Sequence, residues 1–198
     1  MLDVRGKLAV VVGGGPVGLR KARSLLSAGA KVRLVASRFA RPRPAGATVL
    51  RRPYRPADVR GAMLVFACTD DRALNARVAA DARRAGALVN AADQPSDCDF
   101  FVPATLTAGD VVVAVGTGGA APRLAKDLKR RLAKALPAGA GRFAAALARL
   151  RGEMKAAASD ANLRRKVMKR LAGKEGYEAM LRGGTRALRA MMKELSGW

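Results

Sequence analysis

Histidine is absent from this chain of 198 residues. The absence excludes acid–base catalysis by imidazole, metal sites built from histidine, and a Ser-His-Asp triad. Cysteine is also scarce, because Cys68 and Cys98 are the only two and they form no CxxC motif. This pattern predicts reduced thiols and a cytoplasmic protein.

Long apolar segments are missing as well. No run reaches the roughly 18 apolar residues that a transmembrane helix requires, which argues against a membrane protein. The first residues include an acid and lead into an apolar strand, without the basic and apolar regions of a signal peptide. We therefore expect no membrane partner.

Acidic residues are few, so 38 lysines and arginines against 15 acids leave a net charge of +23. Such an excess predicts an anionic partner: nucleic acid, a phospholipid surface or a polyanionic small molecule. Aromatic residues make up only 4% of the chain, and no basic segment alternates with stacking rings, which disfavours nucleic acid. A carboxylate-rich substrate explains the charge better, although a general bias toward alanine and arginine accounts for part of it.

Apolar runs and helical patterns alternate up to about residue 112. This alternation predicts a parallel sheet with helices on both faces, the Rossmann-like α/β class. The expected strands are residues 8–12, 32–35, 47–50, 63–68, 88–90 and 111–115. From Pro122 onward the pattern is helical, interrupted at 137–139 and at 183–184, so a small all-helical domain should end the chain.

A glycine-rich turn follows the first expected strand. Gly13, Gly15 and Gly18 have the GxGxxG spacing, and a helical segment and a second strand come after them on schedule. The first glycine permits the tight turn, the second lets a pyrophosphate approach the backbone, and the third lets helix and strand pack closely. The helix then presents free N–H groups to the phosphates, so the turn predicts a nicotinamide dinucleotide.

The acid that usually binds the ribose hydroxyls in such units is missing. The second strand ends in Ala36-Ser37-Arg38, where an Asp or Glu is expected for NAD. Arg38 is either a contact for the 2′-phosphate of NADP or one more surface arginine.

Polar residues also follow later strands, where parallel sheets bind their ligands. These groups are Thr69-Asp70-Asp71, Asn90-x-x-Asp93 and Gly116-Thr117-Gly118-Gly119, and we expect them to converge with the glycine turn on one cleft. Asp70 and Asp71 have a second interpretation as helix N-caps, and Thr117-Gly118 as a flexible connection. Asp93 stands at no evident helix start, and without histidine it is the best candidate for acid–base work.

The chain resembles the dehydrogenase module of siroheme synthases. The likeness covers roughly residues 1–135 and rests on several motifs in the family's order. They are Gly13-Gly14-Gly15-Pro16-Val17-Gly18-Leu19-Arg20-Lys21, Ala67-Cys68-Thr69-Asp70-Asp71 with Asn75, Val89-Asn90-Ala91-Ala92-Asp93, Cys98-Asp99-Phe100-Phe101-Val102-Pro103-Ala104, and Thr117-Gly118-Gly119-x-x-Pro122-x-Leu124-Ala125.

The resemblance implies NAD-dependent oxidation of precorrin-2 to sirohydrochlorin, on the way to sirohaem. Some relatives also insert ferrous iron into the product. The substrate carries eight carboxylates, which would give the basic excess a partner. The resemblance also implies a homodimer. It divides the chain into an NAD-binding Rossmann domain at residues 1–112, a dimerisation region at 113–148 and a helical domain at 149–198.

The resemblance also assigns roles by position. Pro16 and Val17 would flank the pyrophosphate, and Ser37 and Arg38 would lie near the adenosine ribose, where the family uses NAD without an acid. Asp93 matches the family's important aspartate, proposed as the general base. No resident metal site is expected. Iron insertion would depend on Asp93 with Asp97 or Asp99; the alternative interpretation of Asp97 and Asp99 is that they are turn residues around Cys98.

Two departures and two rival interpretations remain. Gly116 stands where many relatives have a serine that is phosphorylated in some of them, so that regulation does not carry over, and Gly18 replaces a commoner alanine. The rivals are a Rossmann oxidoreductase for another polyanionic substrate and a non-enzymatic dinucleotide sensor. A sensor of this kind should have an acid at the end of the second strand, and this chain has none there. The absence of that acid and the presence of the Asn90–Asp93 loop both favour an enzyme.

Overall fold

The computed structural model describes residues 2–92 and 94–197 and divides the chain into two compact units, one up to Val102 and one from Pro103. Each unit has a hydrophobic core of its own. Within the described ranges, none of the helices combines the length and the apolarity that crossing a lipid bilayer requires.

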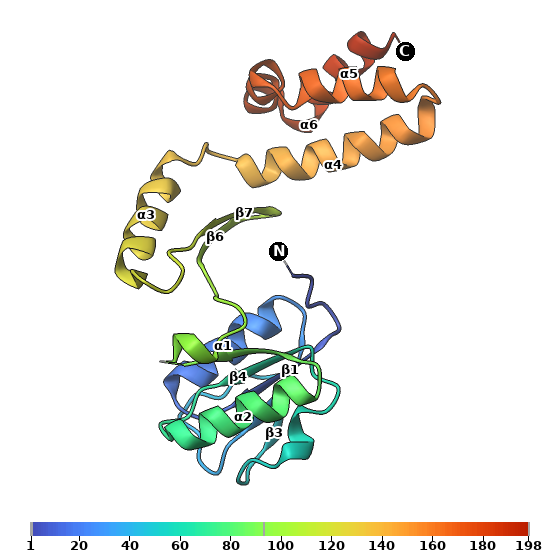
Figure 1. The fold of residues 1–198 in the computed structure, drawn as a ribbon. Helices are drawn as coiled ribbons and strands as arrows, with labels where there is room; N and C mark the ends of the chain where they lie inside the picture. Colours follow the sequence, from blue (N-terminus) through green and yellow to red (C-terminus); the bar gives the residue numbers. More distant parts are fainter. Residues whose placement is uncertain (1, 93, 198) are drawn as a thin grey trace. The chain divides into compact units, whose positions relative to one another are not determined.

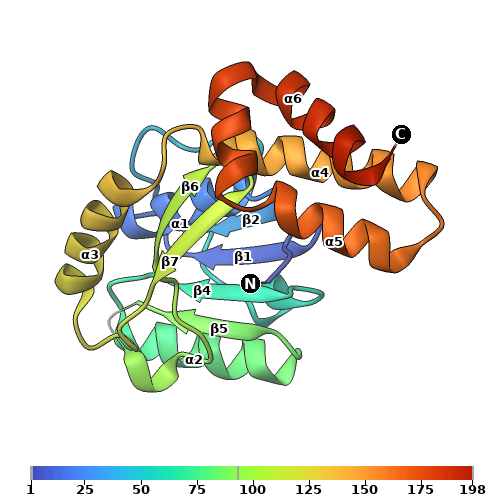
Figure 2. The ribbon, with the colours of Figure 1, turned by 90° about the horizontal axis from the view of Figure 1, so that it is seen from above.

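The first unit is built on a five-stranded parallel sheet. Its strands are β1 (Leu8–Val12), β2 (Lys31–Val35), β3 (Thr48–Leu50), β4 (Leu64–Ala67) and β5 (Leu88–Ala91), in the order β3-β2-β1-β4-β5. All neighbours pair in parallel, and Figure 2 shows the arrows of β1, β4 and β5 pointing the same way. The strand order reverses direction between β1 and β4, which is where an open parallel sheet binds ligands beyond its carboxyl ends.

Two helices cover opposite faces of this sheet: α1 (Pro16–Ser27) and α2 (Arg72–Arg84) (Figure 1). Alternate residues of β1 serve the two layers, because Val11 packs into the core that contains α1 and Val10 into the core that contains α2. Two 3-10 turns complete the unit, η1 (Pro56–Val59) and η2 (Pro95–Asp97). The predicted Rossmann-like α/β class is confirmed.

A buried carboxylate ties η1 to the chain that follows β3. Asp58 accepts hydrogen bonds from the Arg52 guanidinium at 2.8 Å and from the Arg55 N–H at 2.8 Å. Burial raises the pKa of Asp58, but these two donors lower it by more, so the net pKa lies below its ordinary value. A carboxylate of this kind stabilises the fold while it is ionised.

Acid should therefore weaken the first unit partly through Asp58. Its pKa is lower in the folded than in the unfolded chain, so its contribution is present above the unfolded pKa and is lost as pH falls through the folded one. We expect Asp58→Asn to lower the free energy of unfolding by about 2 kcal/mol at pH 7. Urea unfolding at pH 7 and below pH 4 measures this, and a variant that loses as much stability in acid as the parent would contradict it.

The second unit begins with an antiparallel hairpin of β6 (Ala104–Ala108) and β7 (Val111–Val115), against which α3 (Pro122–Ala135) packs. Three further helices follow: α4 (Ala140–Ala157), α5 (Ala161–Leu171) and α6 (Lys174–Ser196). They enclose a separate core around Leu150, Leu171 and Leu188. Non-helical backbone at Gly183 and Gly184 breaks α6, near the interruption expected from the sequence.

One expected strand takes a different place. Residues 111–115 do form a strand, but it pairs with β6 in the second unit and does not extend the parallel sheet. Thr105 and Thr107 alternate with apolar residues and are followed by Gly109 at φ +56°, which is a hairpin signal that the sequence prediction left out. The parallel sheet therefore ends at β5.

Candidate functional site

The glycine-rich turn connects β1 to α1 and is shaped by close backbone contacts. Gly13 has φ +123°, and a Cβ there would overlap the Cys68 carbonyl. A Cβ at Gly18 would overlap the Gly13 carbonyl, so this glycine allows α1 to lie directly on the turn. The roles predicted for the first and third glycines are therefore visible in the backbone.

Gly15 differs from these two glycines. Its φ of −74° is ordinary, and a Cβ built on it would meet no atom within 4 Å. It is the N-cap of α1 and, as a glycine, provides no side chain to cap the helix, and the first turn carries no acid. The space over Gly15 is thus a cradle that a Cβ would fill, with uncapped N–H groups and the positive end of a helix dipole facing it. These residues fit the diphosphate of a dinucleotide.

The end of β2 lies beside this turn. The Ala40 N–H donates to the Gly14 carbonyl at 2.8 Å, and a Cβ at Gly14 would overlap the Arg38 carbonyl. Ser37 and Arg38 are both exposed. The structure therefore brings the predicted ribose-side residues next to the predicted phosphate-side residues.

The loop after β4 also touches the glycine turn, through the Cys68 carbonyl that Gly13 faces. The Thr69 hydroxyl donates to Asn75 Oδ1 at 2.7 Å, and Asn75 is buried. Asp71 caps α2 by accepting from the Leu74 N–H at 3.0 Å, so the capping interpretation is correct for this residue. Asp70 is exposed and does not cap the helix. It remains a candidate for contact with the dinucleotide.

Asp93, the predicted general base, lies outside the described residues. The residues around it can be placed: β5 ends at Ala91, Gln94 is buried, and η2 follows. Because β5 adjoins β4, this loop begins at the same edge of the sheet as Thr69.

The acid that follows η2, Asp99, has structural partners. Asp99 accepts from the Val89 N–H at 2.9 Å and from Arg83 Nε at 3.0 Å. Among residues 2–92 and 94–197, no group of three or more potential metal-ligating acids and thiols is present.

Lys21 stands in the glycine-turn motif, but the sequence interpretation gave it no role. Its ammonium lies 5.4 Å from the centre of the Phe66 ring, on the face of α1 turned toward the sheet. Burial lowers the pKa of Lys21, while Cys68 and Cys98 act on it in the opposite direction. A half-buried cation is thus held near the carboxyl end of β4. Its spacing of three residues from Gly18 is the signal that could have indicated an inward position.

Thr117 and Gly118 belong to the second unit, before α3. The Thr117 hydroxyl accepts from the Ala121 N–H at 3.2 Å, and Gly118 has φ +59°. A hollow of about 860 Å³ lies beside α3, lined mostly by cationic side chains. Its lining consists of Pro122, Arg123, Lys126, Asp127, Lys129 and Arg130. This hollow suits an anionic ligand.

The glycine turn, the uncapped start of α1 and the parallel sheet define a dinucleotide-binding domain of the Rossmann class. Residues 1–104 match the model of the putative NAD(P)-binding family, and the chain belongs to that family. The class predicted from the sequence is confirmed, and the cofactor is a nicotinamide dinucleotide.

Relatives with known names extend this comparison. The chain is 42% identical over 167 residues to the siroheme synthase of Pseudomonas putida (strain W619), covering 82% of this chain and 36% of that protein. It is 37% identical to the siroheme synthase of Azotobacter vinelandii (strain DJ / ATCC BAA-1303), covering 98% and 43%. The resemblance to siroheme synthases is confirmed, and the chain spans about two fifths of the length of these relatives.

A solved structure, "SirC, precorrin-2 dehydrogenase", has the same fold. It superposes with a TM-score of 0.79 over 100% of this chain and 98% of that chain, at 21% sequence identity. The likeness therefore includes the second unit and supports the assignment of the whole fold.

Proposed function

We propose that this chain catalyses the NAD-dependent oxidation of precorrin-2 to sirohydrochlorin. The observation that carries the proposal is the open space over Gly15 at the start of α1, in a chain 42% identical over 167 residues to a siroheme synthase. The fold shared with a structure named precorrin-2 dehydrogenase supports it further.

The dinucleotide would be held by the turn and by both neighbouring strand ends. The backbone of the turn, with Pro16 and Val17, would meet the diphosphate, and Ser37 and Arg38 would lie beside the ribose. Thr69 and Asp70 would border the cofactor after β4. Thr117 and Gly118 are assigned to the cofactor by the resemblance alone. The bound nicotinamide would accept the two electrons that leave the macrocycle.

Asp93 is the proposed general base. Oxidation removes two hydrogens from the macrocycle, one of which leaves as a proton once the electron pair has been transferred. An ionised carboxylate near that carbon can take the proton and pass it to solvent, a role that the chain cannot give to histidine. The chain's other contribution would be to orient the macrocycle and to exclude water.

The basic side chains of the second unit would bind the carboxylates of the substrate. Arg123, Lys126 and Lys129 line the hollow beside α3, whereas Arg130 in the same lining pairs with Asp127. Guanidinium groups bind carboxylates through paired hydrogen bonds, which supplies orientation as well as charge neutralisation. A polycarboxylate substrate is therefore a closer match to this surface than a neutral one.

Cofactor choice and a second activity follow from the resemblance. We assign NAD rather than NADP and a cytoplasmic location. The resemblance also points to a second activity at Asp93, the insertion of ferrous iron into sirohydrochlorin. Parallel assays with NAD and NADP, followed by ferrous ion in the same cuvette, test these assignments. A Rossmann oxidoreductase for another polyanion, or a non-enzymatic dinucleotide sensor, are the alternatives that this experiment separates.

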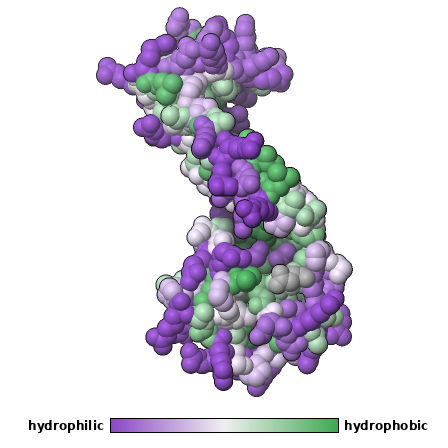
Figure 3. Space-filling model, turned by 90° about the vertical axis from the view of Figure 1, so that its left-hand side faces the viewer, coloured by the Kyte–Doolittle hydropathy of each residue, from purple (hydrophilic) through white to green (hydrophobic). Residues whose placement is uncertain are grey.

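We also propose a homodimer that forms through residues 113–148. Leu124, Leu128 and Leu132 are 51%, 37% and 42% exposed and recur every four residues on α3. Figure 3 shows green hydrophobic surface beside purple charged surface in this part of the second unit. An apolar stripe of this kind on a helix is typical of a protein–protein contact.

Replacing Leu128 by aspartate is expected to convert the dimer to a monomer, because a charge would be buried in the apolar contact. Light scattering coupled to gel filtration measures the mass directly. Leu181→Asp is the matched control, since Leu181 is a comparably exposed leucine on α6, 58% exposed, outside the stripe. A dimeric Leu128→Asp variant would contradict this interface.

A further inference from the structure

The chain returns along the free edge of the sheet after β5. β5 is an edge strand, and an edge strand leaves N–H and carbonyl groups without ladder partners. Residues 98–100 supply those partners: the Asp99 N–H donates to the Val89 carbonyl at 2.8 Å, and the Asp99 carboxylate accepts from the Val89 N–H at 2.9 Å. The edge is thereby closed without another strand.

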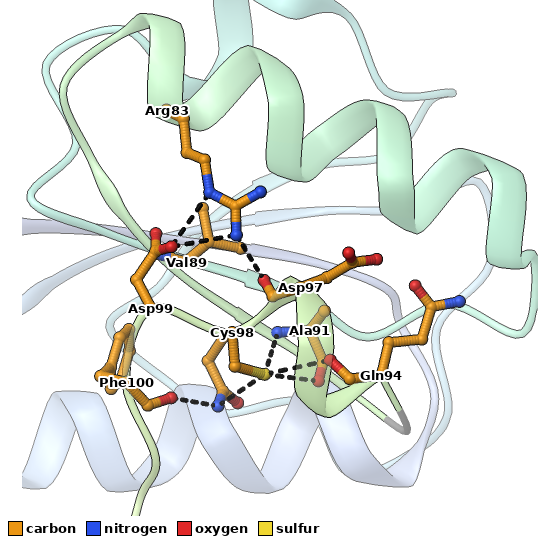
Figure 4. Close-up of polar contacts among 9 residues, drawn as sticks. Arg83, Val89, Ala91, Gln94, Asp97, Cys98, Asp99 and Phe100 are labelled. Carbon is orange, nitrogen blue, oxygen red and sulfur yellow. Dashed lines mark hydrogen bonds and ion pairs between the residues drawn. The ribbon is translucent and has the colours of Figure 1, made fainter.

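The Cys98 thiol does the same for the last residue of the strand. Its sulfur accepts from the Ala91 N–H at 3.2 Å, and its single hydrogen can be donated to the Ala91 carbonyl at 3.2 Å or to the Gln94 carbonyl at 3.4 Å. Figure 4 shows the sulfur placed between these groups. One side chain therefore contacts both the end of β5, at Ala91, and the backbone of Gln94, just before η2.

Arg83 connects this arrangement to α2. Its Nε donates to Asp99 Oδ1 at 3.0 Å, and one Nη donates to the Asp97 carbonyl at 3.0 Å (Figure 4). Burial raises the pKa of Asp99, but the Arg83 guanidinium and the Val89 N–H lower it by more. The carboxylate is therefore charged at neutral pH and forms charge-assisted hydrogen bonds. We call Cys98, Asp99 and Arg83 the edge clip.

The edge clip closes the loop that contains Asp93. On one side of Asp93, the Ala92 N–H donates to the Ala67 carbonyl at 2.8 Å, which continues the pairing of β5 with β4. On the other side, Gln94 is only 8% exposed and its carbonyl faces the Cys98 thiol. Both chain neighbours of Asp93 are thus anchored, and the thiol is the link between the two ends of the loop.

We propose that the edge clip is a positioning device for Asp93, with Cys98 as its central positioning residue. The proposal rests on the proposed function, in which Asp93 removes a proton from the macrocycle. A general base must be held close to its productive geometry, and a misplacement of about 1 Å can cost a factor of about 100 in rate. If the clip served only the stability of the sheet edge, its loss would lower the melting temperature without a specific effect on proton removal.

Alanine and serine at position 98 separate these two roles. Cys98→Ala removes the sulfur's hydrogen bonds, and we expect kcat for precorrin-2 oxidation to fall about 30-fold while the dissociation constant for NAD changes less than about twofold. Cys98→Ser restores a group that donates and accepts, so its kcat should recover to within about threefold of the parent. Tyr54→Phe is the matched control, because it removes one part-buried hydrogen bond, to Asp81, elsewhere in the same unit. It should lower stability and leave kcat unchanged.

A double-mutant cycle identifies the residue through which Cys98 acts. In an Asp93→Asn background, Cys98→Ala should have almost no further effect on the residual rate, because the base that the clip positions is already gone. Multiplicative losses, or a Cys98→Ser enzyme as slow as Cys98→Ala, would overturn the proposal.

Hydrogen exchange distinguishes a failure of this inference from a failure of the proposed function. Amides of residues 91–97 should exchange at least about tenfold faster in Cys98→Ala than in the parent, with or without substrate. Unchanged exchange would contradict the edge clip alone. A parent protein that does not oxidise precorrin-2 contradicts the proposed function, and with it the catalytic role of the clip.

Discussion

Replacing Asp93 by alanine is expected to reduce kcat for NADH formation from precorrin-2 by about a thousandfold, within the range that general acid–base groups contribute. The reason is that the macrocycle must lose a proton, and the chain has no histidine to substitute for the carboxylate. Anaerobic stopped-flow absorbance measures the rate. The affinity for NAD should stay within about threefold, because the proposed diphosphate site lies at residues 13–18, after β1 and not after β5.

Two further variants make this expectation specific. Asp93→Asn preserves the size of the side chain and should be as slow as the alanine variant, because an amide cannot take the proton. Asp97→Asn changes a neighbouring acid of the same loop while keeping the backbone carbonyl that Arg83 contacts, so its rate should match the parent. Normal turnover by Asp93→Asn would remove Asp93 from the mechanism.

Gly15→Ala is expected to leave the fold intact and to weaken NAD binding about 30-fold, or about 2 kcal/mol. The added methyl group meets no protein atom within 4 Å, and the backbone at φ −74° accepts any residue. The same methyl group would occupy the space in which the diphosphate must approach the backbone. Isothermal titration with NAD measures the loss, and thermal unfolding without cofactor should show little change.

Gly13→Ala provides the contrasting case in the same turn. Its Cβ would overlap the Cys68 carbonyl, and φ +123° strains any residue other than glycine. We expect the free energy of unfolding to fall by about 3 kcal/mol or more. If Gly15→Ala instead unfolded the protein, or bound NAD normally, the cradle over Gly15 would not be the cofactor site.

The first unit could be predicted from the sequence because its signals are local. The buried run Leu8–Val12, the glycine spacing and the amphipathic α1 follow one another within about 20 residues, and each constrains its neighbour. Residues 111–115 pair with β6, whose sequence has only a weak strand pattern. The prediction from periodicity alone therefore placed residues 111–115 in the wrong sheet. A strand's pairing partner is a tertiary property that its own residues do not specify.

The candidate site was predictable to a similar extent. The turn at residues 13–18 and the ends of β2 and β4 were expected to meet, and backbone contacts at Gly13 and Gly14 bring them together. The roles of Cys98 and Asp99 were not predicted, because a free strand edge and the side chains that cover it become visible only in three dimensions. Asp71 had two interpretations, and the hydrogen bond to Leu74 decided for the cap.

The most direct test of the central claim is an anaerobic incubation of the purified chain with precorrin-2 and NAD, followed by absorbance. The account predicts that NADH and sirohydrochlorin appear together in a one-to-one ratio and that omitting either the protein or the dinucleotide prevents both. A flat trace with NAD and with NADP, at protein concentrations that bind the cofactor, would contradict it.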